Sequence, residues 1–523
     1  MNYEVLRRRS SSCSFLCLEV DQESINLKLY LVCGQCERRP VEYLHRQLKL
    51  ASVEQCDTDL YQELIKVSRV RRVLRLIFGG GSRSPWRYGK AETMDKMQEI
   101  KKVAFLSTYP PRECGLATFT EDLVNEITKI GLVRPRIIAV SAGTEEYEDA
   151  RVVYKLDQHK RESYPKTAQW VNTHADLLVI EHEYGIFGGE CGEYIIDLAK
   201  NLKIPFVITT HTVLEAPLIK QQEVLRELGK LSTGLVTMAE SSVPILVGIY
   251  GIAPEKIVVI PHGVPSMLVG AREKLKAGQG LKDKQVVSSF GLLSPAKGIE
   301  YGIEAIAKVA AEFTDVVYLV LGKTHPVVKE TSGESYRQSL MDLAEGLGVR
   351  DNVRFVDKYL TKEEVIKYLH LSDIYLTPYL SKEQAVSGTL AYAVGCGRVV
   401  VSTPYRYARE MLGEGRGMLA EFRDAASLSS CISHIFRNPL QKKEMELKTM
   451  AIGRTMTWDK VANSYTQQFL SIINKFKMGK VGVKDLNGWI GDSLEQRRQP
   501  LYPIMYRAHE RIAVGRSGGG TNE

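Results

Sequence analysis

From Lys101 onward, short apolar runs rich in β-branched residues alternate with amphipathic stretches, and this alternation restricts the fold more than any other feature. The run KKVAFLS predicts a buried strand, and the stretch TFTEDLVNEITKIG predicts a helix that opens at Thr118 and closes at Gly131. Buried strands that alternate with helices are typical of a parallel sheet covered on both faces, with right-handed crossover connections.

The alternation occurs twice, which predicts two successive α/β domains rather than one enlarged sheet. A chain of 523 residues is long enough for two or three domains. The first series continues through RPRIIAVSAG, ADLLVIEHEYG and IPFVITTHTV, with a helix over EYIIDLAKNLK. The second series comprises QVVSSFGLLSP, DVVYLVLGKT, NVRFVDKYL, DIYLTPYLS and RVVVSTPY, and PEKIVVIPHGVP at 254–265 is the expected crossing between the two.

These patterns predict five segments. We expect a poorly ordered leader over 1–97, which shows no sustained period, and a polar, Gly-rich tail over 477–523. Between them lie an N-terminal Rossmann-like domain over 98–262, a C-terminal one over 263–456 and a closing helix over 457–476. The apolar positions that share one face of this last helix are Val461, Tyr465, Phe469, Ile472 and Ile473.

Charge and cysteine content limit the class of protein. The net charge of +8 lies in the flanks, because 1–97 carry 17 Lys/Arg against 12 Asp/Glu and 477–523 carry 8 against 5, which leaves the body neutral. The body therefore has no electrostatic footprint for nucleic acid. We find no apolar run that would cross a bilayer, and sparse, unpatterned cysteine suits a reducing cytoplasm, where we expect the protein.

Candidate site residues follow three strands of the first predicted sheet. Ligands of a parallel sheet bind beyond the carboxyl ends of its strands. Gly115 lies at a helix start, where its missing side chain would admit a ligand to the backbone, although an ordinary turn also explains it. Glu181, His182 and Glu183 cluster at a strand end, and without a ligand at zinc spacing they favour a polar loop over a metal site. His211 lies at the end of another strand. It is either a structural histidine or part of a functional site, and the sequence leaves both interpretations open.

Two places in the second domain suit phosphate. A strand ends at Gly291, and Lys297 then stands beside a helix start, where a cation and backbone N–H groups together suit a diphosphate. A solvated surface lysine is the alternative. The residues Ser387, Gly388 and Thr389 open a helix of small residues, and Glu383 and Gln384 just before them could bond sugar hydroxyls.

In their order and spacing these motifs resemble the family-4 glycosyltransferases of the GT-B fold, also described as glycosyl transferases group 1. The resemblance covers 103–476 and includes PHGV at 261–264, GLLSPAKG and a closing TW…VA…Y helix, which in that fold crosses back onto the first domain. It implies transfer of a hexose from a nucleotide-sugar donor to a carbohydrate or other hydroxyl acceptor, mostly with retention. The nucleotide sugar is then a substrate, and we expect no cofactor and no metal.

The resemblance implies roles for the residues at the strand ends. Gly115 would line the acceptor side, where we also place Glu183, and the expected catalytic residues are His211, Lys297 and Glu383. The expected donor-binding residues are Gly291, Lys297, Gln384, Ser387, Gly388 and Thr389.

Two positions depart from the family pattern. The family usually has an arginine directly after the glycine that matches Gly291, and this chain has Leu292. The family also has a pair of glutamates with the spacing Glu-x₇-Glu. An alignment on Gly397 without gaps places Gln384 and Tyr392 at these two positions. Glu383 occupies the first position only if the alignment is shifted by one residue. A catalytically weakened protein that binds sugar nucleotides or glycans is therefore the alternative function.

Two other classes are less favoured. A dinucleotide oxidoreductase would need a first strand that runs into GxGxxG, and neither domain has one. A nucleic-acid binder has only the charge of the flanks to support it. The sugar, the base, the acceptor and the oligomeric state stay open.

Overall fold

The computed structural model describes residues 100–143, 145–266 and 270–480, together with the backbone of four strands between residues 4 and 40. The chain divides into two compact units, 1–97 and 98–523. In the first unit the strands form an antiparallel sheet that the sequence analysis did not predict; they are β1 (Glu4–Leu6), β2 (Ser14–Asp21), β3 (Asn26–Cys33) and β4 (Arg39–Pro40).

The first domain of the second unit is a parallel sheet of seven strands in the order β11-β10-β9-β8-β5-β6-β7. The chain turns from one half of the sheet to the other between β5 and β8, and such a switch point is where this fold binds ligands. The strands are β5 (Lys101–Ser107), β6 (Val133–Ser141), β7 (Val152–Asp157), β8 (Leu177–His182), β9 (Phe206–Thr210), β10 (Gly234–Thr237) and β11 (Ile257–Val259).

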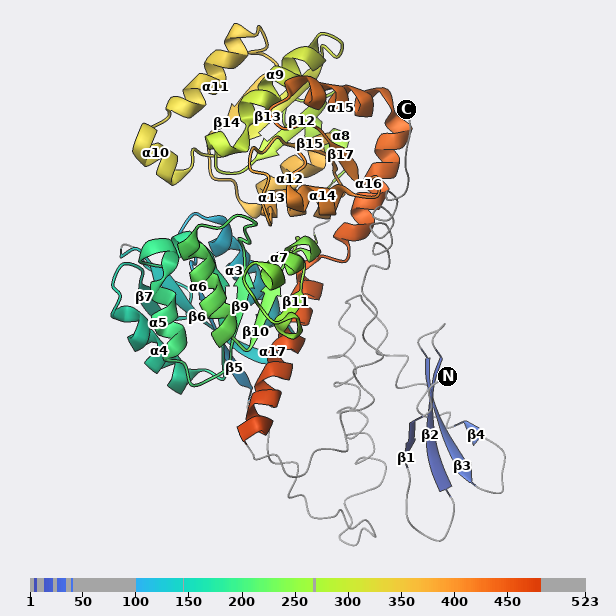
Figure 1. The fold of residues 1–523 in the computed structure, drawn as a ribbon. Coiled ribbons are helices and arrows are strands. Elements are labelled where there is room, and N and C mark those ends of the chain that lie inside the picture. Colours follow the sequence, from blue (N-terminus) through green and yellow to red (C-terminus); the bar gives the residue numbers. More distant parts are fainter. Residues whose placement is uncertain are drawn as a thin grey trace, which may run out of the picture. The chain divides into compact units, whose positions relative to one another are not determined.

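Helices cover both faces of this sheet (Figure 1). The first begins at Gly115, earlier than the predicted Thr118, because the Cys114 thiol caps it by accepting from Ala117 N over 3.4 Å, and Gly131 ends it at φ 71°. The helices are α3 (Gly115–Ile130), α4 (Ser163–His174), α5 (Tyr194–Lys200), α6 (Ile219–Leu231) and α7 (Val243–Gly248), with short 3-10 turns η1 (Tyr184–Ile186), η2 (Glu190–Gly192), η3 (Glu240–Ser242) and η4 (Pro254–Lys256).

The second domain has six parallel strands in the order β14-β13-β12-β15-β16-β17, with its switch point between β12 and β15. The strands are β12 (Gln285–Phe290), β13 (Val316–Leu321), β14 (Val353–Val356), β15 (Ile374–Thr377), β16 (Val399–Ser402) and β17 (Gly417–Leu419). Its helices are α8 (Arg272–Ala277), η5 (Pro295–Lys297), α9 (Ile299–Ala310), α10 (Pro326–Ser332), α11 (Ser335–Gly346), α12 (Lys362–Leu371), α13 (Gly388–Gly395), α14 (Arg406–Leu412), α15 (Ala425–Arg437) and α16 (Pro439–Gly453). Two parallel Rossmann-like domains confirm the predicted fold class.

The last helix, α17 (Trp458–Lys480), returns to the first domain and continues past Phe476, where the sequence placed its end (Figure 1). All five residues of its predicted apolar face are buried, and the Phe469 ring packs edge-on against Phe105 of β5 with centroids 5.9 Å apart. Burying one such side chain stabilises the fold by about 1.5–3 kcal/mol, so this face fastens the helix to the first sheet. The last helix therefore lies against the first domain.

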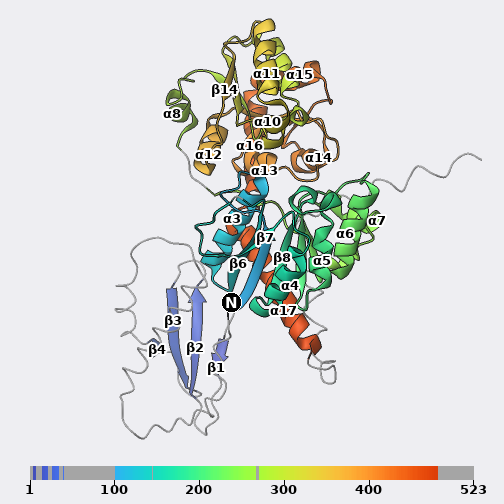
Figure 2. The ribbon, with the colours of Figure 1, turned by 90° about the vertical axis from the view of Figure 1, so that its left-hand side faces the viewer.

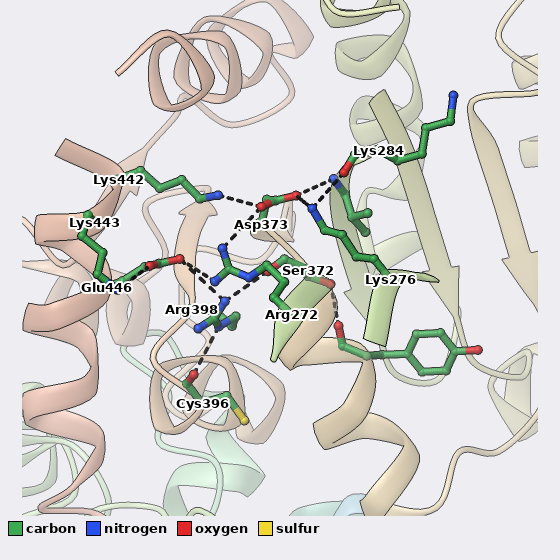
Figure 3. A network of polar contacts seen from close by, with 12 residues as sticks. Arg272, Lys276, Lys284, Ser372, Asp373, Cys396, Arg398, Lys442, Lys443 and Glu446 are labelled. Atoms are coloured by element: carbon green, nitrogen blue, oxygen red, sulfur yellow. Dashed lines mark hydrogen bonds and ion pairs between the residues drawn. The ribbon is translucent and has the colours of Figure 1, made fainter. Parts of the chain in front are cut away.

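A buried ionic network anchors α8 and α16 at the amino ends of the second sheet's strands, opposite the switch-point edge (Figure 3). Asp373, directly before β15, accepts from Lys442 Nζ over 2.7 Å and from Lys276 Nζ over 2.8 Å, and Arg272 joins it to Glu446. Removing one member of a buried ion pair typically costs about 3–5 kcal/mol. We assign this network a structural role.

Candidate active site

Both predicted acceptor-side residues, Gly115 and Glu183, lie at the switch point of the first sheet. A Cβ added at Gly115 would meet no atom within 4 Å, so the backbone at the start of α3 is accessible. Glu183 follows β8, and its Oε2 accepts from Thr212 Oγ1 over 2.5 Å. That carboxylate therefore braces the loop that carries His211.

His211 stands at the end of β9 and pairs with a buried carboxylate. Its Nε2 lies 2.8 Å from Oε2 of Glu181, a residue with no exposed surface, and its backbone N–H donates to His182 O over 3.1 Å. In the sequence Glu181 stands beside His182 and Glu183 at the end of β8, and only the register of β8 beside β9 identifies His211 as its partner.

A cluster of rings connects His211 to the second domain. Phe119 of α3 packs edge-on against His211 at 4.8 Å and against His262 at 5.2 Å between centroids. Burial lowers the pKa of His262 to about 4, so this ring is neutral near pH 7. A Cβ placed on Gly388 would lie 3.0 Å from His262 Nε2, so the start of α13 approaches this ring closely. The predicted donor helix and His211 are thereby brought to the same region.

Lys297 lies at the switch point of the second sheet, beside the predicted phosphate-binding residues. Its Nζ stands 3.9 Å from the centroid of the Tyr379 ring, and the Tyr379 hydroxyl is 2.8 Å from Thr389 Oγ1. Burial raises the pKa of Tyr379, but the Lys297 charge and the hydrogen bonds of the Tyr379 hydroxyl together outweigh burial and keep this pKa below its ordinary value. A small cavity here is lined by Gly291 and Lys297, among others. The structure thus brings Gly291, Lys297 and Thr389 together.

The start of α13, which contains the expected donor-binding residues Ser387, Gly388 and Thr389, presents backbone donors. Ser387 is the N-cap residue, and its Oγ accepts from Leu390 N over 3.3 Å. The remaining N–H groups of the first turn have no partner within the helix and form a site for negative charge.

Glu383 and Gln384 occupy the loop before α13 and make different contacts. Gln384 Nε2 donates to Val386 O over 2.7 Å, so this amide is bonded within its own loop. Arg406 Nη2 donates to the Glu383 carbonyl over 3.3 Å and also reaches Val213 O in the first domain. Arg406, which sequence analysis missed, therefore fixes the backbone of this loop against the loop that carries His211.

Tyr392, at the position of the second family glutamate, bonds to the first domain. Its hydroxyl donates to Asp122 Oδ2 of α3 over 2.9 Å, and Asp122 also pairs with Lys362. Figure 2 shows α13 next to α3, where this contact forms. Residues 270 positions apart carry no local signal of such a contact, and sequence analysis missed it.

In the part of the chain that the structure describes, no group of three or more His, Cys, Asp or Glu side chains could hold a metal ion. Glu181 and Glu183, which the sequence places beside His182, take different partners, His211 and Thr212. No helix within these residues is long and apolar enough to span a membrane.

Comparison with known proteins finds similarity to a glycosyltransferase family. Residues 271–453 match the model of the family "Glycosyl transferases group 1". A D-inositol 3-phosphate glycosyltransferase of Stackebrandtia nassauensis is 25% identical over 241 residues, which cover 44% of this chain and 52% of that protein. A GDP-mannose-dependent alpha-(1-6)-phosphatidylinositol monomannoside mannosyltransferase of Mycolicibacterium smegmatis is 23% identical over 363 residues, covering 64% of this chain and 89% of that protein. The chain thus spans about half the length of the first of these relatives.

Solved structures agree on the fold. The Anabaena protein HepE, solved in complex with UDP and glucose, superposes with a TM-score of 0.57 at 17% identity, covering 71% of this chain and 100% of that one. At such identity the similarity establishes the GT-B architecture alone.

Proposed function

We propose that this chain, which belongs to the glycosyl transferases group 1 and has the GT-B fold, is a nucleotide-sugar-dependent glycosyltransferase. It moves a hexose to a hydroxyl acceptor with retention of the anomeric configuration. The observation that carries this proposal is the meeting of Lys297 with the start of α13 at the switch point between β12 and β15. A cation and free backbone donors at such a point suit the diphosphate of a sugar nucleotide.

The chemistry follows from where charge develops. When the nucleoside diphosphate leaves, negative charge grows on its phosphate and oxocarbenium-like positive charge grows on the sugar. Lys297 and the N–H groups at the start of α13 stabilise the leaving phosphate, and donors that are fixed before the reaction give the largest effect. Glu181, with no exposed surface and 2.8 Å from His211, adds negative charge on the sugar side.

The test is a donor screen. UDP- and GDP-hexoses are incubated with the protein and candidate acceptors, and the released nucleoside diphosphate is measured by mass spectrometry. Since the relatives are named for inositol-containing acceptors, inositol phosphates are tested first, followed by simple sugars. Release that depends on both donor and acceptor supports the proposal, and a screen with no release argues against it. A cytoplasmic location stays a prediction that cell fractionation tests.

The second candidate function is binding without turnover. It is favoured by Tyr392, which stands in place of a family carboxylate and bonds to Asp122. Calorimetric titration and a turnover assay on the same preparation separate the two functions. Tight binding of a sugar nucleotide that is never consumed identifies a binding protein.

A further inference from the structure

The loops that follow β12 and β13 run side by side through backbone hydrogen bonds. Leu293 N donates to Lys323 O over 2.8 Å, and His325 N donates to Leu293 O over 2.9 Å. Gly322 has φ 137°, and a Cβ on it would lie 2.0 Å from Gly291 O, so only glycine permits this approach. The loop of Lys323 is therefore fixed beside Leu292, the position where the family arginine is missing.

The side chain of Lys323 reaches across to the first domain. Its Nζ lies 3.1 and 3.2 Å from the two carboxylate oxygens of Glu113, in the loop just before Gly115. The two side chains are 45% and 47% exposed. An ion pair as exposed as this one contributes little to stability, so a stronger anion can take Lys323 from Glu113 at little cost.

His325 adds a neutral donor to the same loop. Its Nδ1 accepts from Val327 N over 3.3 Å, which leaves the proton of the neutral ring on Nε2. Burial and then the charge of Lys297 keep the pKa of His325 below its ordinary value. The loop after β13 thus carries one positive charge, on Lys323, and one neutral donor, the His325 ring, which lies near the charge of Lys297.

We propose that Lys323 is the second cation of the donor diphosphate site, in place of the arginine that is missing at Leu292, and that Glu113 holds it until the donor binds. This inference rests on the proposed function. A diphosphate carries more negative charge than one carboxylate, and it lies between Lys297 and the loop after β13. Because Glu113 precedes Gly115, the exchange of partners links donor binding to the acceptor side of the site.

Calorimetric titration with UDP and with GDP tests the proposal. We expect Lys323→Ala to weaken nucleoside diphosphate binding about tenfold or more, because one charge-assisted contact is lost. Lys329→Ala, an exposed lysine on α10, is the matched control and should bind as the parent does. Leu292→Arg in the Lys323→Ala background should restore affinity, because it returns a cation to the neighbouring loop. Thermal unfolding of each variant checks that the fold is intact.

The Glu113→Gln variant separates phosphate binding from a merely structural contact between the domains. If Glu113 competes with phosphate for Lys323, this variant binds the nucleoside diphosphate more tightly than the parent. If the ion pair only holds the domains together, it binds more weakly, as Lys323→Ala does, and the proposal fails. Parent-like binding by Lys323→Ala also overturns it. A parent that binds neither UDP nor GDP overturns the proposed function, and this inference with it.

Discussion

Oε2 of Glu181 lies 2.8 Å from Nε2 of His211, and these two atoms join the ends of neighbouring strands β8 and β9. Among the described residues the other oxygen of Glu181 has no hydrogen-bond partner, although this side chain has no exposed surface. A buried carboxylate with a single hydrogen bond is stabilised by that bond, and the bond in turn fixes the orientation of the histidine ring. We infer that Glu181 positions His211.

Glu181→Gln keeps the shape of the side chain and removes its charge. We expect kcat to fall about 10–100-fold, the equivalent of the ~1.5–3 kcal/mol that a hydrogen bond to a charged group contributes. In a double-mutant cycle, Glu181→Gln should cost little further activity once His211→Ala is present, because both act through one bond. Fully additive losses in steady-state kinetics would show that Glu181 acts elsewhere.

Lys297→Ala should reduce turnover far more than thermal stability. Lys297 is the last residue of η5, just before α9, and its ammonium group stacks on the Tyr379 ring. It acts on negative charge that develops only when the phosphate leaves. Removing one such preorganised donor typically costs ~2.7–4 kcal/mol, about 10²–10³ in rate. Lys308→Ala, an exposed lysine on α9, is the matched control. Equal activity of Lys297→Ala and parent would remove Lys297 from the site.

The loop before α13 gives a prediction on the family carboxylate. If Glu383 takes the first glutamate position through a one-residue shift, Glu383→Gln should depress kcat/KM strongly, by ~1–3 kcal/mol or more, because polar groups of the site lose their partner. Gln384→Ala should matter less, since the Gln384 amide is bonded to Val386 O. Kinetics that show the reverse order would make the ungapped alignment correct.

The sequence predicted what is local and missed what is not. Strand ends at His211 and Gly291 and the apolar face of α17 follow from periodicity, and the structure ends the two strands one residue earlier, at Thr210 and Phe290. The strand β17 was missed because it has only three residues, and β7 was missed because this edge strand has a single buried residue, Leu156. The strand β10 was also missed, although strands of its length were predicted in the second domain. The pairs Asp122–Tyr392 and Glu113–Lys323 join residues more than 200 positions apart, so only the arrangement of the two domains reveals them.

His182 gives a prediction on acid stability. Burial lowers the pKa of its ring to about 3, and among the described residues neither ring nitrogen has a hydrogen-bond partner. A histidine in the unfolded chain takes up a proton near pH 6.5, whereas the buried ring in the folded protein stays neutral at this pH. Between about pH 6.5 and 3 the unfolded state therefore binds more protons, so stability is fully present above that window and falls as the pH falls.

His182→Phe removes this proton uptake, and the new ring would pack against the same neighbours, Tyr184 and Phe187. Below pH 6.5 the free energy of unfolding of the parent should fall by about 1.4 kcal/mol per pH unit more than that of the variant. Urea denaturation at pH 7, 6 and 5 measures the difference, and His159→Ala, at an exposed position, should keep the parent's dependence. If parent and His182→Phe lose stability in parallel, the His182 ring is already protonated in the folded protein and its charge has a partner.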